Sequence, residues 1–126
     1  MLGLWGGWNG GGSMKTANRL RKNEDFRKVY RQANSMANKL LILYIRKNDL
    51  EYTRAGFTVS KKVGKSVVRS KVKRKMRESY RLNDNKFIKG YDLVFIAREG
   101  CKEASFQEIE SALLHLMRKK KLLLQR

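Results

Sequence analysis

The segment 65–81, near the middle of the chain, has an apolar side chain at every fourth position: Val68, Val72, Met76 and Tyr80. An α-helix turns once in about 3.6 residues, so this spacing places all four side chains on one stripe along roughly four to five turns. Such a stripe has to be buried against a second layer of structure. The rest of the chain must therefore supply a sheet or further helices on which this helix packs.

Three other segments have the composition of β-strands. Leu40–Arg46 is apolar, and Arg54–Ser60 alternates between apolar and polar residues. We expect these two to be neighbouring strands, joined as a hairpin through the loop 47–53. Asp92–Ala97 is continuously apolar after its first residue, which indicates a buried strand, and Gly90 supplies the turn before it.

Two more helices are predicted, one on each side of this central region. Asn23 is expected to be the N-cap of a short helix with an acidic first turn, extending to about Tyr30. Ser105 is expected to cap the last helix, and the segment 118–126 after it is expected to fray. The apolar face of the last helix is expected to consist of Phe106, Ile109, Leu113 and either Leu116 or Met117.

The predicted order is therefore helix, strand, strand, helix, strand, helix. It indicates an α+β fold in which three helices pack on one small central sheet. A chain of 126 residues has room for one domain, which we assign to residues 14–126. Residues 1–13 carry no charge and are rich in glycine, so we interpret them as a flexible leader. The leader is either non-native or translated from a start placed ahead of the true one at Met14, and we favour the second interpretation.

The charge of the chain indicates the class of its partner. Lys and Arg number 30 and Asp and Glu 11, giving a net charge of +19. A compact protein with this charge repels itself, so a polyanion such as nucleic acid is the expected partner. A membrane-surface protein would need a basic amphipathic helix with a bulky apolar face or a lipidation signal, and neither is obvious here. A spanning helix would need roughly 20 apolar residues, and no stretch of the chain approaches that length. The single cysteine, Cys101, can form no internal disulfide, and we expect a cytoplasmic protein.

The helix predicted at 65–81 carries eight basic residues, and Glu78 is its only acid. Solvated helix faces normally mix charges of both signs at i, i+4, whereas this one does not, so we interpret it as a phosphate-binding surface. Its basic residues are Lys65, Arg69, Lys71, Lys73, Arg74, Lys75, Arg77 and Arg81. The preceding loop adds Lys61 and Lys62. Its Gly-Lys-Ser is not a P-loop, because Val59 stands where that motif needs glycine.

Three aromatic residues, Phe26, Tyr30 and Tyr44, could stack on the bases of a single-stranded partner. An aromatic pair at i, i+4 is more commonly part of a core, and the pattern alone favours that interpretation.

The residues offer little for catalysis by the polypeptide. His115 is the only histidine, so an acid/base pair of two histidines is impossible. The acids are scattered, without the spacing that would hold two metal ions, and Cys101 has no evident basic partner. We therefore expect no catalytic residue and no protein metal site.

With these segments identified, the sequence resembles the protein component of bacterial ribonuclease P. The resemblance covers about residues 18–120. It is carried by Asn23–Tyr30, by Ser35–Tyr44, by Asp92–Arg98 and above all by Arg54–Glu78, where a strand ending in Val-Ser-Lys-Lys runs into a basic helix.

The resemblance implies a subunit that binds the catalytic RNA of ribonuclease P and the 5′ leader of precursor tRNA. Cleavage would then be performed by water and Mg²⁺ held mainly by the RNA, and no obligate protein partner is evident. It assigns leader binding to Phe26, Tyr30 and Tyr44, which reverses the interpretation from pattern alone. It assigns binding of the RNA subunit to Lys61, Lys62, Lys65, Arg69, Ser70, Lys71, Lys73, Arg74 and Arg77.

Two further features of the family bear on this chain. The Arg-Asn-Arg motif of the family's basic helix corresponds here to Arg69, Ser70 and Lys71, so an amide and one guanidinium are replaced. The family also has an unusual left-handed strand-helix-strand crossover, which the resemblance implies for this chain.

Two other functions compete with this one. A structural RNA-binding protein of ribosomal type would explain the basic helix equally well, but it would have no use for a leader site. A metal-dependent nuclease acting alone would cleave RNA without an RNA partner, and the missing acid/base residues count against it.

Overall fold

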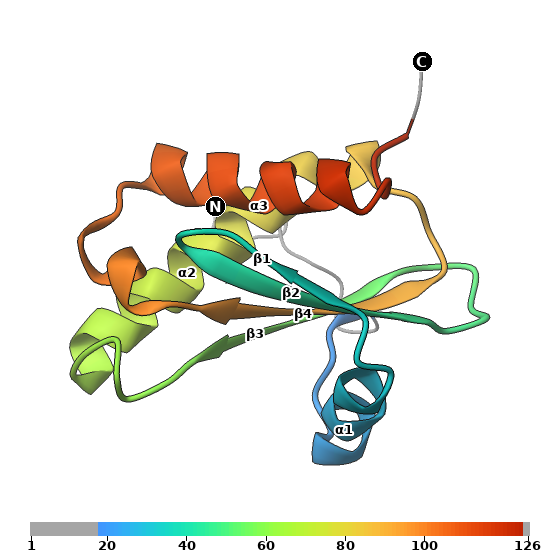
Figure 1. Ribbon diagram of the computed structural model, residues 1–126, viewed down its shortest axis with the longest axis horizontal. Helices are drawn as coiled ribbons and strands as arrows, with labels where there is room; N and C mark the ends of the chain where they lie inside the picture. The colour runs from blue at the N-terminus through green and yellow to red at the C-terminus, as the bar shows by residue number, and fades with distance from the viewer. Residues whose placement is uncertain (1–17, 125–126) are drawn as a thin grey trace.

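The computed structural model describes residues 18–124, so the predicted leader, residues 1–13, lies outside the described residues. The elements are α1 (Asn23–Arg31), β1 (Ser35–Ala37), β2 (Leu41–Lys47), β3 (Arg54–Val59), α2 (Ser66–Asn83), β4 (Tyr91–Ala97) and α3 (Phe106–Lys119) (Figure 1). Two 3₁₀ segments, η2 (Asp84–Lys86) and η3 (Glu99–Glu103), flank β4. The predicted α+β fold of three helices on a small sheet is confirmed.

The strands form one mixed sheet in the order β1-β2-β4-β3. β2 is antiparallel to both β1 and β4, whereas β3 is parallel to β4. The predicted hairpin between the second and third strands is therefore wrong, because β4 lies between them. α2 carries the chain from the end of β3 back to the start of β4, which makes the two strands parallel. The left-handed crossover that the resemblance implies for this connection stays a prediction.

β1 was not predicted from the sequence. It pairs Ser35 with Tyr44, Met36 with Leu43 and Ala37 with Ile42. It is only three residues long and contains no β-branched or aromatic residue, so it lacks the local signal of a strand. The hydrogen bonds of the neighbouring β2 determine its conformation.

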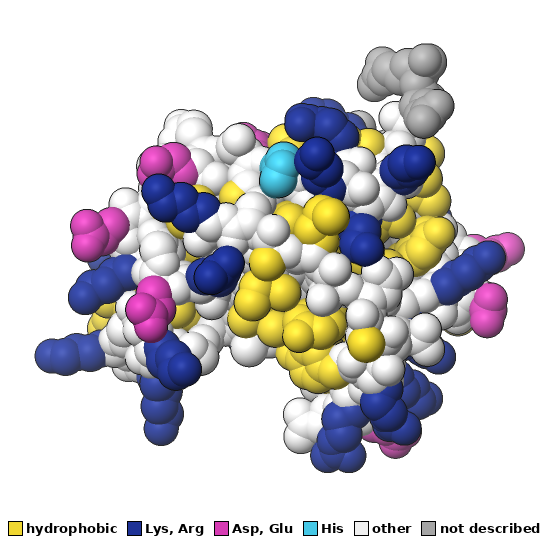
Figure 2. Space-filling model, in the orientation of Figure 1, with side chains coloured by type: hydrophobic (Ala, Val, Ile, Leu, Met, Phe, Trp, Pro, Cys, Tyr) yellow, Lys and Arg dark blue, Asp and Glu magenta, His cyan; other side chains and the backbone are white. Residues whose placement is uncertain are grey.

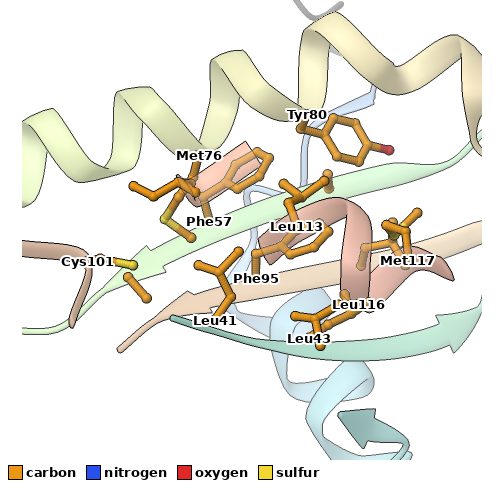
Figure 3. Close-up of a cluster of buried hydrophobic side chains, with 14 of the residues drawn as sticks. Leu41, Leu43, Phe57, Met76, Tyr80, Phe95, Cys101, Leu113, Leu116 and Met117 are labelled. Atoms are coloured by element: carbon orange, nitrogen blue, oxygen red, sulfur yellow. The ribbon is translucent and has the colours of Figure 1, made fainter. Parts of the chain in front are cut away.

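α2 and α3 cover one face of the sheet, and α1 lies against the other (Figure 1). The main core lies under α2 and α3. Figure 3 shows Met76 and Tyr80 from α2 pointing toward Phe57 and Phe95 of the sheet, and all four are at most 7% exposed. The predicted stripe on α2 is thus the buried side of that helix. On the opposite face of the sheet a smaller cluster joins α1 to β4 through Leu20, Val29 and Val94.

The two predicted helix caps have different outcomes. Ser105 is the N-cap of α3 in a capping box, where Glu108 N donates to Ser105 Oγ at 3.1 Å and Ser105 N donates to Glu108 Oε1 at 2.8 Å. Asn23 is not the cap of α1. Lys22 holds that position without a side-chain hydrogen bond, and Asn23 is the first helical residue.

The prediction that the chain frays after α3 is wrong as far as Leu124, the last described residue. Leu122 is buried, and its carbonyl accepts from Ile88 N at 2.7 Å. Leu124 N donates to Lys86 O, also at 2.7 Å. The apolar side chain of Leu122 fills the edge of the core, so this segment packs against the residues between η2 and β4.

Candidate nucleic-acid interface

Phe26, Tyr30 and Tyr44, which we call the aromatic row, come together on the sheet face that carries α1. The rings of Tyr30 and Tyr44 meet edge to face with centroids 5.0 Å apart, and those of Phe26 and Tyr30 are 6.5 Å apart. Tyr30 is 36% exposed, while Phe26 and Tyr44 are partly buried. The rings of the aromatic row are therefore partly buried and partly accessible to solvent. Their contacts with one another hold them in place without a ligand.

A glycine on β3 makes room for the first ring of this row. A Cβ atom added at Gly56 would lie 2.5 Å from Phe26 Cζ and 2.7 Å from Phe26 Cε1. Because contacts this short are excluded sterically, Phe26 can lie directly against β3 only while residue 56 has no side chain. At the other end of the row, Tyr30 contacts Tyr44 of β2, so α1 lies across the middle of the sheet.

A buried ionic cluster fastens α1 to the sheet. Asp92 of β4 is fully buried and accepts two hydrogen bonds from Arg54 of β3, Nε to Oδ1 at 2.9 Å and Nη2 to Oδ2 at 2.7 Å. Asn48 Nδ2 donates to the same carboxylate at 2.8 Å. Arg54 Nη1 also lies 3.7 Å from Asp25 Oδ2 on α1. The hydrogen bond to Asp92 raises the pKa of Arg54, although burial acts in the opposite direction.

The sheet surface beside the aromatic row is apolar and bordered by cations. Figure 2 shows hydrophobic side chains gathered over the sheet next to α1, with Lys and Arg side chains around them. A cavity of about 490 Å³ beside Ile42 of β2 is lined by three cations, Lys39, Lys62 and Arg98, and by one acid, Glu99. Lys62 was predicted to bind RNA, whereas Lys39 and Arg98 were not, since they lie in loops without a recognisable pattern.

The predicted RNA-binding residues of α2 and the loop before it occupy the outer surface of the molecule. Arg69 and Arg77 are partly buried, and Arg69 Nε donates to Gly64 O at 3.1 Å, which ties the loop to the helix. The remaining members are exposed: Lys61, Lys62, Lys65, Ser70, Lys71, Lys73 and Arg74.

A residue outside the predicted set joins this surface from the N-terminal segment. Arg19 forms a parallel bridge with Ala55 at the outer edge of β3, and Leu20 N donates to Ala55 O at 3.0 Å. This placement brings Arg19 close to Lys73 and Arg77. Lys73 is exposed as a residue, but its ammonium has lost part of its solvent. This loss lowers the pKa of Lys73 most, and the charges of Arg77 and Arg19 lower it further.

The pKa of Arg77 is lowered for similar reasons, first by burial and then by the charge of Arg19. No sequence pattern connects Arg19 to α2, because β3 and the loop after it separate the two in the chain. Like charges held together in this way favour an anionic partner, since bound phosphate would relieve the repulsion.

The basic residues of α2 do not form the single unpaired row that the sequence predicts. Lys75 Nζ donates to Ala104 O at 2.9 Å, next to the start of α3. Arg81 and Glu78 form a bidentate pair, with Nη2 to Oε1 at 2.7 Å and Nε to Oε2 at 3.0 Å. The cations instead divide between a side facing the edge of β3, with Lys73 and Arg19, and a side facing α3.

The residues considered for catalysis have structural partners. Asn38 Nδ2 lies 3.2 Å from His115 Nδ1 and 2.9 Å from Ala112 O, an arrangement that links the start of β2 to α3. Cys101 is buried with its Sγ 3.1 Å from Leu40 O, and burial raises the pKa of this thiol. Within residues 18–124, His, Cys, Asp and Glu form no group of three or more that could hold a metal ion.

The same part of the chain contains no helix that is both long enough and apolar enough to cross a membrane.

Comparisons with known proteins agree on one family. The sequence profile of the Ribonuclease P family matches residues 14–121. The ribonuclease P protein component of Alkaliphilus metalliredigens is 66% identical over 110 residues, which are 87% of this chain and 99% of that protein. That of Clostridioides difficile is 50% identical over 101 residues, 79% of this chain and 89% of that protein.

Solved structures give the same result. The ribonuclease P protein of Staphylococcus aureus superimposes with a TM-score of 0.79 at 32% identity, covering 86% of this chain and all of that one. The protein from Thermotoga maritima gives a TM-score of 0.74 at 33% identity, covering 80% of this chain and 96% of that one. Fold, profile and sequence identity coincide over the segment that carries the aromatic row and the basic helix, and the chain belongs to the ribonuclease P family as its protein component.

Proposed function

We propose that this subunit binds RNA through two separate surfaces, one for the catalytic RNA of ribonuclease P and one for the 5′ leader of precursor tRNA. The loop before α2 and the exposed side of that helix bind the RNA subunit. The aromatic row binds the leader. Together the two contacts promote the endonucleolytic maturation of tRNA by the ribonucleoprotein in the cytoplasm.

The observation that carries this proposal is the geometry of the aromatic row. Tyr30 keeps 36% of its surface exposed while its ring contacts Tyr44 at 5.0 Å, so a polar and aromatic surface stays open beside the sheet. Bases of any sequence can stack on such rings, which suits a leader whose sequence differs from one tRNA precursor to the next. A structural RNA-binding protein of ribosomal type would need the basic helix but not this surface.

In this proposal the protein supplies binding, and the RNA supplies the chemistry. Mg²⁺ held mainly by the RNA subunit would activate the water that attacks the scissile phosphodiester. The contacts of His115 and Cys101 support this division, because Asn38 Nδ2 lies 3.2 Å from His115 Nδ1 and the Cys101 thiol is buried 3.1 Å from Leu40 O.

The proposal is tested by comparing two tyrosines of equal exposure. Tyr30 and Tyr52 are each 36% exposed, but only Tyr30 belongs to the aromatic row. In the reconstituted holoenzyme, Tyr30→Ala should weaken binding of precursor tRNA by about 1 to 3 kcal/mol and leave mature tRNA unaffected. Tyr52→Ala should change neither. Equal losses for precursor and mature tRNA with Tyr30→Ala would instead favour the ribosomal type of RNA binding.

A further inference from the structure

A second surface of α2 combines positive charge with apolar side chains. A groove of about 390 Å³ lies between the outer side of α2 and the start of α3, and its volume is within the range of about 300 to 1,000 Å³ typical of ligand pockets. It is lined by Lys71, Arg74, Lys75, Glu78, Leu82 and Phe106.

Most of the exposed lining of this groove is apolar. Phe106, the first residue of α3, is partly buried, and Leu82 in the last turn of α2 is 52% exposed. A single exposed leucine is ordinary on a protein surface. Here, however, it lines the same concave site as an aromatic ring, and a flat apolar group in that site could contact both.

The charges around the groove favour an anionic ligand. The carboxylate of Glu78 is neutralised by its bidentate pair with Arg81, at 2.7 and 3.0 Å, so it does not oppose a phosphate. The ammonium of Lys75 donates to Ala104 O. Lys71 and Arg74 are exposed, and neither forms a salt bridge with any residue between 18 and 124.

We propose that this groove binds an unpaired nucleobase of the ribonuclease P RNA, with the base stacked on the Phe106 ring against Leu82. Lys71 and Arg74 bind the phosphates on either side of that nucleotide. An apolar floor with two free cations at its margin matches a nucleotide, which joins a flat ring to a phosphate. The inference rests on the proposed function, and it adds base recognition to a helix surface that otherwise attracts RNA by charge alone.

The test separates stacking from charge by means of salt dependence. Binding of each variant to a bacterial ribonuclease P RNA is measured over a range of salt concentrations. Phe106→Leu, which removes the ring but stays apolar, should lower the affinity roughly 5- to 150-fold at every salt concentration without changing the slope. Phe106→Trp should retain the affinity. Arg74→Gln should lower the slope by about 0.7 to 0.9, as expected for the loss of one phosphate contact.

Two further variants test the groove even if a substitution at Phe106 disturbs the fold. Leu82→Ser, at a half-exposed position, should weaken binding in the same salt-independent way even if a change at Phe106 disturbs the core. Leu50→Ser is the matched control, because Leu50 is 38% exposed in the loop between β2 and β3 and lies outside both the groove and α2. It should bind like the unmodified protein. Thermal unfolding of each variant shows whether the fold is retained.

The outcomes distinguish this inference from the proposed function. If the unmodified protein binds the RNA with a steep salt dependence and the Leu82 and Phe106 variants bind equally well, no base occupies the groove and the inference is overturned while the proposed function stands. If these variants weaken only the binding of precursor tRNA, the assignment to the RNA subunit is wrong. If the unmodified protein does not bind the RNA at all, the proposed function fails as well.

Discussion

Arg54 on β3 and Asp92 on β4 are partners across the parallel strand pair and also form a bidentate ion pair beneath α1, at 2.9 and 2.7 Å. The carboxylate is fully buried, whereas the side chain of Arg54 is 21% exposed and reaches Asp25 of α1. One arginine therefore connects the beginnings of β3 and β4 to the helix that carries two rings of the aromatic row.

Removing the carboxylate should destabilise the protein strongly. Asp92→Asn leaves the partly buried Arg54 with only the more distant carboxylate of Asp25, 3.7 Å away, and breaking a buried pair in this way costs about 3 to 5 kcal/mol. The free energy of unfolding in urea, followed by circular dichroism, measures the loss. Glu103→Gln, which removes an exposed carboxylate from η3, is the control and should stay within about 0.5 kcal/mol. A loss below 1 kcal/mol for Asp92→Asn would contradict this role of the pair.

A methyl group at residue 56 should disturb the aromatic row without touching any charged residue. In Gly56→Ala the new Cβ would lie 2.5 Å from Phe26 Cζ, so the ring has to move. Overpacking of this kind costs about 1 to 3 kcal/mol of stability, and the affinity for precursor tRNA should fall with it while that for mature tRNA is unchanged. Gly100→Ala, whose nearest contact would be Leu40 Cδ2 at 3.1 Å, should leave both affinities intact. Equal precursor binding by the two variants would argue against a positioned ring at residue 26.

The sequence predicts those parts of the fold that depend on local patterns. The stripe on α2 and the N-cap at Ser105 are determined by residues a few positions apart, and both are confirmed. The hairpin prediction failed because pairing depends on distant segments: β4, which follows α2, enters the sheet between β2 and β3. The prediction that Leu122 frays failed for the same reason, because the carbonyl of Leu122 accepts a hydrogen bond from Ile88, a residue more than 30 positions earlier in the chain.

The candidate site shows the same division. Lys71 and Arg74 lie on a helix whose charge pattern can be recognised in the sequence. Arg19 could not be found in this way, because only the parallel bridge to Ala55 brings it beside α2. The groove at Phe106 was also missed, since the sequence places that residue on the apolar face of α3, whereas the structure leaves it at the end of the helix, beside α2.

Lys73 should strengthen RNA binding but lower the free energy of unfolding of the protein without RNA. It is four residues before Arg77 on α2, and its pKa is lowered by loss of solvent and by the charges of Arg77 and Arg19. Lys73→Gln relieves one like-charge i, i+4 pair and should raise the free energy of unfolding by about 0.2 to 0.5 kcal/mol. The same change should lower the salt slope of RNA binding by about 0.7 to 0.9.

Unfolding in urea and RNA binding as a function of salt measure the two effects of Lys73→Gln. Lys102→Gln, at an exposed position in η3, is the matched control and should leave the salt slope unchanged. If Lys73→Gln destabilises the free protein or keeps the slope of the unmodified chain, Lys73 does not belong to a phosphate-binding cluster.

Cys101 should make the stability of the protein sensitive to alkaline pH. Burial raises the pKa of this thiol above its ordinary value of about 8.5, so the unfolded chain loses the proton first. Below that pH the contribution of the neutral thiol is fully present, and it is lost as the pH rises toward the raised value. The difference in unfolding free energy between the unmodified protein and Cys101→Ala should therefore shrink above pH about 8.5. A difference that is constant up to pH about 10 would show that the thiol titrates alike in both states.

The central claim is that this chain assists an RNA catalyst by binding RNA. It is tested most directly by adding the protein to a bacterial ribonuclease P RNA at low Mg²⁺ concentration and measuring 5′ cleavage of precursor tRNA. We predict that cleavage is slow with the RNA alone, absent with the protein alone and restored when both are present. Failure of the protein to stimulate the RNA, or cleavage by the purified protein without it, would contradict the account.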